Sequence, residues 1–365
     1  MGDFFCTCSM GILLLLQSML RRIILLPVLF FLFADCSFAQ RLGGQAIFNF
    51  LELSNAPQLS ALGNVNVSNI SHDVSLGFYN PALLQKDMDR TASVNFNSMY
   101  AGIKNYQLNA AYFAQKPAIT LSAGISYFDY GSIPQTDALG NELGTFRPGD
   151  YVVQVSASRQ YSNRIRYGAT LKYISSNYGL YKASGIAVDA GVVYADSSKQ
   201  FQAAIVLKNM GAQLRTYADT RENSLPFDLQ VGVTKRLADA PVQFSLTAHH
   251  LHQFNIRYRD TLFNNENGFT GGGKGFADNL FRHFVAACQL YIGEHLEITG
   301  AYNHLRRAEL AIPGATNGLN GFSLGLGALF NKMQLRYARS YYQGSSAYNH
   351  LGINLNFREF TFRRQ

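Results

Sequence analysis

Residues 120–127 read TLSAGISY and alternate strictly between apolar side chains and small or polar ones. Because successive side chains of a β-strand point to opposite faces, this pattern predicts a strand with one apolar and one polar face. The same alternation recurs along the chain, and it assigns Leu121, Val231 and Leu296 to the apolar face and Ser122, Gln230 and Thr299 to the other. A sheet of such strands has one side suited to lipid and one suited to water.

From Thr91 onward the chain repeats one unit of about ten alternating residues and a turn. The repeat predicts fourteen strands, at 92–100, 105–114, 118–130, 149–162, 164–176, 182–195, 200–210, 226–237, 241–253, 280–293, 295–306, 319–331, 333–343 and 346–358. Their lengths suit the ~9 to 11 tilted residues that cross a bilayer and exceed the ~5 to 6 typical of soluble sheets.

The connections between these strands alternate in length. Six are tight turns, at 115–117, 162–163, 196–198, 238–240, 293–294 and 331–332. Between them lie longer polar segments that include 131–148, 211–225, 254–279 and 307–318. Short periplasmic turns and long outer loops are typical of outer-membrane barrels. The sequence therefore predicts an all-β fold, a 14-stranded antiparallel transmembrane barrel over 91–358 with both ends periplasmic and a C-terminal tail at 359–365.

Composition supports a membrane barrel and excludes membrane helices. Only 15% of the residues are charged and 47% are hydrophobic, whereas a soluble domain has about 25% charged residues. Beyond residue 40, no apolar run approaches the ~18 residues that a membrane helix needs. The formal charge is +8, for which outer-membrane lipid and lipopolysaccharide would be counter-charges. Solvating residues at strand ends explain this excess equally well, and we expect no nucleic-acid partner for an exported chain.

The first 39 residues resemble a cleaved export signal. Arg21 and Arg22 precede an apolar run, and cleavage between Ala39 and Gln40 follows small residues. Met19 would open a signal peptide of ordinary length, which predicts a true start there; a longer signal peptide gives the same mature chain. Removal of 1–39 leaves Cys288 as the single cysteine, so we expect no disulfide.

The last predicted strand carries a second export feature. The machinery that inserts barrels recognises a terminal strand with a polar residue, a glycine two positions later and apolar residues at alternate positions near its end. His350, Gly352, Leu355 and Phe357 fit this pattern. We therefore predict that these residues form the insertion signal.

Residues 40–90 lack the alternating pattern of the strands and contain Asn and Ser clusters and a possible helix near 57–62. Barrels of ~8 strands fill their interior with side chains, and barrels of ~16 to 18 leave a channel. Fourteen strands therefore require a filling segment or conduct solutes. Glycines 321, 325 and 327 place small groups on the inner face, which leaves room for residues 40–90 as a plug.

The plug segment resembles the start of proteins of the PorV/PorQ family, a branch of the FadL-like barrels. The residues that carry the resemblance are Gly43, Gly44, Phe48, Phe50, Leu53, Ala61, Leu62, Gly63, Asn80, Pro81 and Ala82. The stretch from Gly43 to Leu53 points to the PorQ group, whereas Ala-Leu-Gly and Asn-Pro-Ala are shared by FadL-like barrels generally. Asn64 departs from the family, which more often has a second glycine there.

The resemblance implies a non-enzymatic component of the type IX protein secretion system. Such barrels sit in the outer membrane and help hold the surface attachment complex, the sortase and its associated surface protein, which attaches cargo to lipopolysaccharide. Two alternatives share the barrel: a FadL-like channel for hydrophobic small molecules and a membrane-embedded hydrolase. A channel predicts a greasy pocket beneath the outer loops and a gap in the wall; an anchor predicts loops that bind protein.

No catalytic, cofactor or metal site is expected from the motifs. Residues 321–325 read GFSLG, a nucleophile-elbow pattern, but inside a predicted strand rather than on a strand-to-helix turn. Residues 268–274 have phosphate-loop spacing, but Gly275 stands where Ser or Thr should hold magnesium. His249, His250 and His252 would be split between two faces of a strand, without a nearby Cys or carboxylate.

Overall fold

The computed structural model describes residues 46–217, 224–256, 276–310, 318–343 and 346–361. The predicted signal peptide, its cleavage site at Ala39 and Gln40, and the motif residues Gly43 and Gly44 lie outside the described residues. So do the phosphate-loop pattern at 268–274 and the end of the tail at 362–365.

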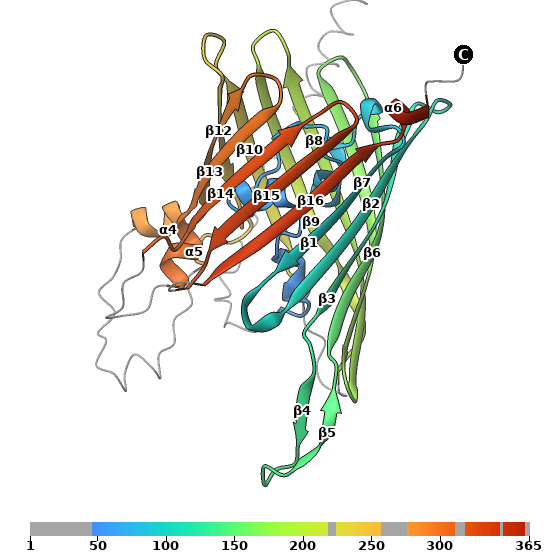
Figure 1. Ribbon diagram of the computed structural model, residues 1–365, viewed down its shortest axis with the longest axis vertical. Helices are drawn as coiled ribbons and strands as arrows, with labels where there is room; N and C mark the ends of the chain where they lie inside the picture. Colours follow the sequence, from blue (N-terminus) through green and yellow to red (C-terminus); the bar gives the residue numbers. More distant parts are fainter. Residues whose placement is uncertain (1–45, 218–223, 257–275, 311–317, 344–345, 362–365) are drawn as a thin grey trace, which may run out of the picture. The chain divides into compact units, whose positions relative to one another are not determined.

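Fourteen antiparallel strands close into a barrel, as predicted (Figure 1). Each strand pairs with its neighbours around the wall, and the first pairs with the last from Thr91↔Asn356 to Ser98↔Asn349. The barrel strands are β1 (Thr91–Ser98), β2 (Lys104–Ala114), β3 (Ile119–Asp129), β6 (Gly149–Gln160), β7 (Ile165–Tyr178), β8 (Tyr181–Asp196), β9 (Phe201–Arg215), β10 (Asp228–Arg236), β11 (Val242–Ala248), β12 (Phe284–Ile292), β13 (Leu296–Asn303), β14 (Phe322–Leu329), β15 (Met333–Tyr341) and β16 (Ala347–Asn356).

The two faces of the wall follow the predicted alternation. Leu121 and Leu296 are exposed on the outside, at 41% and 52%, while Ser122 and Thr299 are buried in the lumen. Asn, Gln, Ser and Thr dominate the buried positions of the strands, and Leu, Ile, Val and Tyr the exposed ones. An outward apolar band around a polar interior is the pattern of a membrane-spanning barrel.

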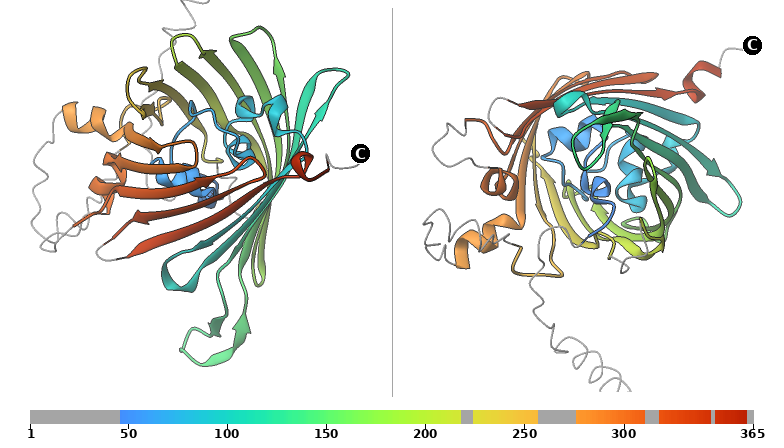
Figure 2. Two further views of the ribbon diagram at one scale, coloured as in Figure 1. Left: turned by 45° about the horizontal axis from the view of Figure 1, so that its top comes forward. Right: turned by 90° about the horizontal axis from the view of Figure 1, so that it is seen from below.

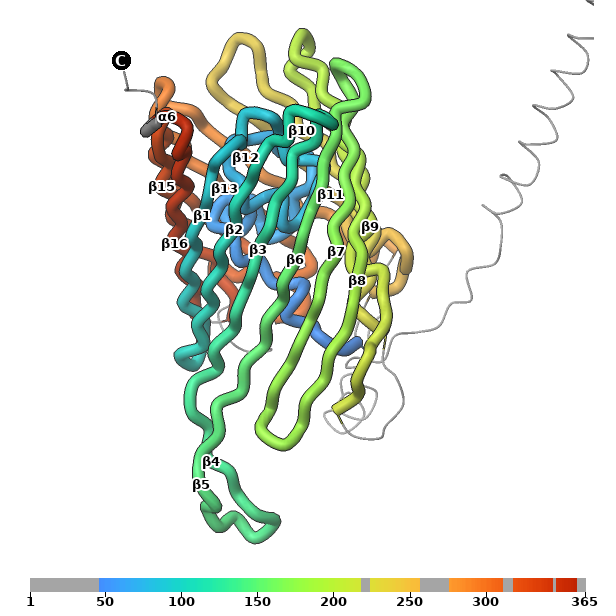
Figure 3. The backbone as a smooth tube through the Cα atoms, turned by 90° about the vertical axis from the view of Figure 1, so that its right-hand side faces the viewer, coloured from blue at the N-terminus to red at the C-terminus, as the bar shows by residue number. Residues whose placement is uncertain are grey.

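Tight turns lie at one end of the barrel. The long connections lie at the other end, where Gly179 and Leu180 also form a short turn between β7 and β8. The turn side also carries the start of β1, the end of β16 and α6 (Arg358–Thr361). The loop side faces outward in membrane barrels. It carries η5 (Tyr100–Gly102), α4 (Phe276–Arg282) and α5 (His304–Glu309), and a hairpin of β4 (Ile133–Thr136) and β5 (Glu142–Phe146) that extends beyond the wall (Figures 1 and 3).

The described part of the N-terminal segment, 46–90, lies inside the barrel (Figure 2). It enters at the loop side, where Ala46 pairs with Ser224, and leaves at the turn side to become β1. Its short helices are η1 (Asn49–Glu52), α2 (Pro57–Ala61), η2 (Val74–Phe78), η3 (Pro81–Leu83) and η4 (Lys86–Met88). None of the helices in the described part of the chain is long and apolar enough to cross a membrane.

Several predicted boundaries were wrong. The strand predicted at 200–210 continues to Arg215, into the predicted loop 211–225. The segment 131–148 was expected to be a loop but contains the β4–β5 hairpin. The strand predicted at 241–253 ends at Ala248, because His250 adopts the left-handed conformation with φ 54°. Residues 280–282 belong to α4. Residues 304–306 begin α5, because the side chain of Asn303 accepts a hydrogen bond from the Arg306 N–H and caps a helix there.

Candidate functional site

The Asn-Pro-Ala element anchors the plug in the middle of the lumen. The Asn80 side chain accepts a hydrogen bond from the Ala82 N–H at 3.0 Å and caps η3, while its amide donates to the Val67 carbonyl at 2.7 Å. Pro81 occupies the first turn of η3, where its missing N–H costs nothing. All three motif residues are buried, so their observed role is to fix the backbone of the plug.

Inward-facing glycines make room for the plug. A Cβ on Gly168 of β7 would lie 2.7 Å from the Pro81 carbonyl carbon and 2.9 Å from the Ala82 nitrogen. A Cβ on Gly325 of β14 would collide with the Ala61 side chain of α2. Of the three glycines expected to leave room for a plug, Gly325 contacts it, whereas Gly321 and Gly327 face Arg307 and Arg336.

The Ala-Leu-Gly element ends α2 and turns the chain. Leu62 is fully buried, and Gly63 has φ +87°, a conformation that favours glycine. Asn64 follows with φ 72°. Asn tolerates this left-handed region better than most residues other than glycine, so the turn forms without a second glycine.

A buried ion network ties the plug to the wall near the turn side. Arg336 of β15 lies 3.0 Å from Glu297 of β13 and 3.7 Å from Asp73 of the plug, and all three side chains are nearly inaccessible. Glu297 also accepts a hydrogen bond from Gln289 at 2.8 Å. Sequence reasoning missed this latch, although alternation places Glu297 and Arg336 on the inner face, where buried charges require partners.

A cavity of about 370 Å³ opens at the loop side above the plug. Phe48 and Phe50 of the plug motif line it together with Tyr130, Tyr178, Tyr217 and the buried Asp150. The hydroxyls of Tyr130 and Tyr178 donate to Asp150 at 2.6 and 2.9 Å. Burial, followed by the negative charge of Asp150, raises the pKa of Tyr130. This outer aromatic cavity therefore combines aromatic rings with polar groups, namely the hydrogen-bonded carboxylate and the tyrosine hydroxyls.

A second loop-side cavity, of about 230 Å³, lies where the plug meets β9, β10 and α5. Its lining combines apolar residues such as Leu53, Leu305 and Leu310 with charged and titratable ones, which are Glu52, Lys208, Asp228, His249, His250, Arg306 and Glu309. The carboxylate of Asp228 lies 3.7 Å from Nδ1 of His250. The argument that no carboxylate lies near the histidine cluster was therefore wrong: the strand ends before His250, and the chain turns back toward β10.

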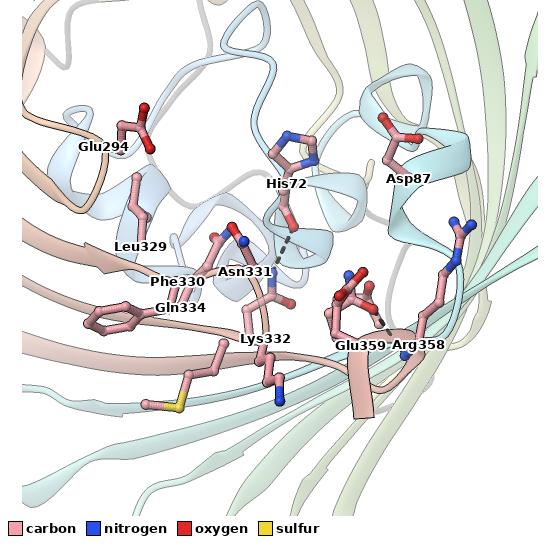
Figure 4. Close-up of a pocket in the computed structure, with 14 residues that line it drawn as sticks. His72, Asp87, Glu294, Leu329, Phe330, Asn331, Lys332, Gln334, Arg358 and Glu359 are labelled. Carbon is pink, nitrogen blue, oxygen red and sulfur yellow. Dashed lines mark hydrogen bonds between the residues drawn. The ribbon is translucent and has the colours of Figure 1, made fainter. Parts of the chain in front are cut away.

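At the turn side, a cavity of about 530 Å³ lies between the plug, the β14–β15 turn and α6 (Figure 4). His72 and Asp87 line it from the plug side, and Lys332, Arg358 and Glu359 from the wall and α6. The His72 carbonyl accepts a hydrogen bond from Asn354 of β16 at 2.7 Å. This cavity mixes both signs of charge and is more polar than apolar, although Leu329, Phe330 and Met333 also line it, so it suits water and ions.

The predicted insertion-signal residues lie on two faces of the last strand. His350 and Gly352 point into the lumen, where His350 is 1% exposed and a Cβ on Gly352 would touch Pro57 of the plug. Leu355 and Phe357 lie on the outer side, with Phe357 48% exposed. Their role in insertion stays a prediction, and His350 and Gly352 also contact the plug.

The elbow-like serine is not placed for catalysis. Ser323 lies within β14 with its hydroxyl buried in the lumen, where it accepts a hydrogen bond from Arg306 at 2.8 Å and donates to Ser340 at 3.1 Å. A nucleophile elbow instead places its serine on a strained turn between strand and helix. Ser323 is therefore a structural lumen residue.

No protein-family model and no curated protein matches this chain. Among solved structures, the CymD monoaromatic hydrocarbon channel is 13% identical with a TM-score of 0.49, over 85% of this chain and 99% of the channel. The Pseudomonas putida toluene transporter TodX is 10% identical with a TM-score of 0.41, over 83% and 93%. A mutant of the Rh. blastica porin is 7% identical with a TM-score of 0.30, over 73% and 98%. Similarity at this level does not assign a function to the chain.

Proposed function

We propose that this protein is a non-enzymatic outer-membrane barrel of a type IX secretion system, which anchors or supports the cell-surface sortase and attachment complex. The resemblance of its plug motif to the PorV/PorQ family supports this function. The structural observation that carries it is the β4–β5 hairpin on the loop side, because an anchor needs a surface for protein outside the bilayer.

The hairpin has the features of a protein contact. It forms a separate two-stranded sheet, so both of its edges are open to pairing. Its apolar side chains Leu139 and Leu143 are 87% and 64% exposed, and Ile133 is 40% exposed. An isolated two-stranded hairpin is at best marginally stable in water. Pairing with the sortase or its associated surface protein would cover these side chains and complete an edge.

The filled lumen supports anchoring over conduction. Plug and wall are joined by direct hydrogen bonds, such as Asn55 to Ser126 at 2.9 Å, Ser68 with Thr234 at 2.8 Å and Asn69 to Gln289 at 2.8 Å. Each bond of this kind contributes about 0.5 to 1.5 kcal/mol net. A plug held at many points suits a barrel that bears a complex rather than one that opens freely.

The test replaces residues 132–147 by a short Gly-Ser turn. Asp129 and Gly149 are directly paired, so the turn needs to bridge only neighbouring strands and should leave the barrel folded. We expect type IX cargo to be released into the medium instead of being retained with lipopolysaccharide. The double variant Leu139→Ser/Leu143→Ser should lose part of this retention, and Thr145→Ser on the same hairpin should lose none. Normal cargo retention in both the shortened variant and a full deletion would refute the proposal.

A second candidate function is passage of a hydrophobic small molecule, the class of role named for the CymD and TodX channels. The outer aromatic cavity favours it, because its rings offer an apolar surface beneath the outer loops. If cells lacking the protein keep cargo at their surface but lose uptake of a monoaromatic compound, and Phe50→Ala alone lowers that uptake, the channel function replaces the anchor.

A further inference from the structure

The segment that follows β11 is held in place from both sides. On one side, the His249 N–H donates to the His283 carbonyl at 2.9 Å, and the His283 ring contacts the His249 carbonyl at 2.7 Å. On the other side, the Leu251 N–H donates to the Leu229 carbonyl of β10 at 3.2 Å. The Gln253 N–H donates to the His250 carbonyl at 3.1 Å and closes a turn. This segment is therefore a built element of the loop-side rim.

The turn brings two imidazoles to one carboxylate. Ligand atoms of Asp228, His250 and His252 all lie within 4.8 Å of one another. His250 has φ 54°, a left-handed conformation that is uncommon for a residue other than glycine. Such an outlier persists only where its surroundings hold it, and it is often found at functional sites.

We propose that Asp228, His250 and His252 form a zinc site at the loop-side rim, with three protein ligands and one open position. Two imidazole nitrogens and one carboxylate are a ligand set that Zn²⁺ prefers, and three protein ligands leave a fourth position for water or for a donor from another molecule. At metal–ligand distances of about 2.1 Å, neighbouring ligand atoms of a tetrahedral site lie about 3.4 Å apart. Asp228 and His250 are already 3.7 Å apart, so small side-chain rotations complete the geometry.

The surroundings orient these ligands. The two oxygens of Asp228 accept hydrogen bonds from the His250 N–H and from Gln230, both at 2.6 Å. The His252 ring packs edge-on against Phe227 at 5.0 Å. Such outer contacts fix ligand orientation and are worth 10- to 100-fold in metal affinity. The His250 side chain is 21% exposed and that of Asp228 8%, so an ion from the medium can reach the site.

The nearby charges do not forbid a cation. Lys208 and Arg306 are the permanent cations of the same cavity, and the Lys208 ammonium lies 5.4 Å from the Tyr79 ring. Glu52 and Glu309 line the same cavity and offset these charges. The site therefore resembles a neutral-to-acidic pocket open to a divalent ion.

The test uses tag-free full-length mature barrel in detergent, stripped with a chelator and titrated with Zn²⁺ and with Co²⁺ as a spectroscopic probe. We expect one equivalent of either ion, with the visible absorption of a tetrahedral Co²⁺ site. Asp228→Asn, His250→Ala and His252→Ala should each weaken binding at least tenfold. Asp228→Asn keeps an acceptor for the His250 N–H, and heat-modifiable migration on a gel verifies that each barrel is folded.

Two histidine variants serve as controls. His295 lies at a tight turn on the opposite side and His304 lies 3.4 Å from Asp278, so His295→Ala and His304→Ala should leave zinc affinity unchanged. The proposal is overturned if folded wild-type barrel binds no zinc, or if stoichiometric binding survives all three ligand substitutions. Loss of binding only in His304→Ala would also overturn it by placing the ion at Asp278.

Discussion

Gly168 of β7 carries only a hydrogen atom as its side chain, and this leaves room for the plug against the wall. Its missing side chain leaves space for the backbone of Pro81 and Ala82, which a Cβ would approach to 2.7 and 2.9 Å. Backbone atoms cannot move aside as the end of a flexible side chain can. An inward glycine that contacts plug backbone is therefore a requirement of the fold.

We predict that Gly168→Ala destabilises the barrel by about 1 to 3 kcal/mol, the usual cost of overpacking. The matched control is Gly300→Ala in β13, where a Cβ meets only Leu324 at 3.9 Å. Denaturant unfolding of both variants in detergent measures the difference. Equal stability of the two variants would show that the plug does not pack against β7 as described.

The histidine cluster marks the limit of residue-level prediction. Strict alternation along 241–253 puts His249 on one face and His250 and His252 on the other, with no carboxylate nearby in the sequence, but the strand ends at Ala248 and His250 is left-handed. The partner, Asp228, begins another strand more than twenty positions earlier. A pattern of period two predicts which face a strand residue takes, but not where a tertiary hydrogen bond stops the strand.

At the scale of elements, sequence periodicity was most successful where strands are long and half-buried. Each barrel strand overlaps a predicted segment, because one face must meet lipid and the other polar groups along the whole strand. The β4–β5 hairpin was missed for the converse reason. Its strands are exposed on both faces, so no alternation distinguishes them from a polar loop. The short plug helices follow no periodic pattern, since each is only one turn long.

The stability of the turn between β4 and β5 should depend on pH. Asp137 accepts backbone hydrogen bonds from Leu139 at 2.9 Å and Asn141 at 2.8 Å. The hydrogen bond from the side-chain amide of Asn141, followed by the backbone hydrogen bonds, lowers the pKa of Asp137 below its ordinary value of 3.8. Because the folded pKa is lowered, the stabilisation is complete above the unfolded value and is lost as pH falls through the folded one.

We expect the amides of residues 139–141 to lose hydrogen-exchange protection, corrected for intrinsic rate, as pH falls below 3.8. At neutral pH, protection should decrease in the order wild type, Asp137→Asn, Asp137→Ala, since Asn keeps an acceptor without the charge. Amides in the nearby strand β3 provide the internal control and should not change. Equal protection in all three proteins would mean that the turn is held by its backbone alone.

At the scale of the whole molecule, the buried latch joins the plug to the wall. Arg336 pairs with both Glu297 and Asp73, and removal of one partner from a buried ion group costs about 3 to 5 kcal/mol because the remaining charges lack compensation. We predict that Arg336→Gln loosens the plug. Planar-bilayer recordings of this variant should then show stepwise increases in conductance that the wild-type protein lacks. Arg339 lies on the outer face of the same strand, so Arg339→Gln is the control and should show no conductance steps.

The path of the plug links the order of assembly to the closed seam. Residues 46–90 run the full height of the lumen, from Ala46 beside Ser224 on the loop side to the turn side, where the same chain becomes β1 and pairs with β16. A segment that threads a closed ring and is also part of that ring cannot be inserted sideways afterwards. The β1–β16 pairing therefore closes around a segment already in place, or the free end of that segment is drawn through the ring.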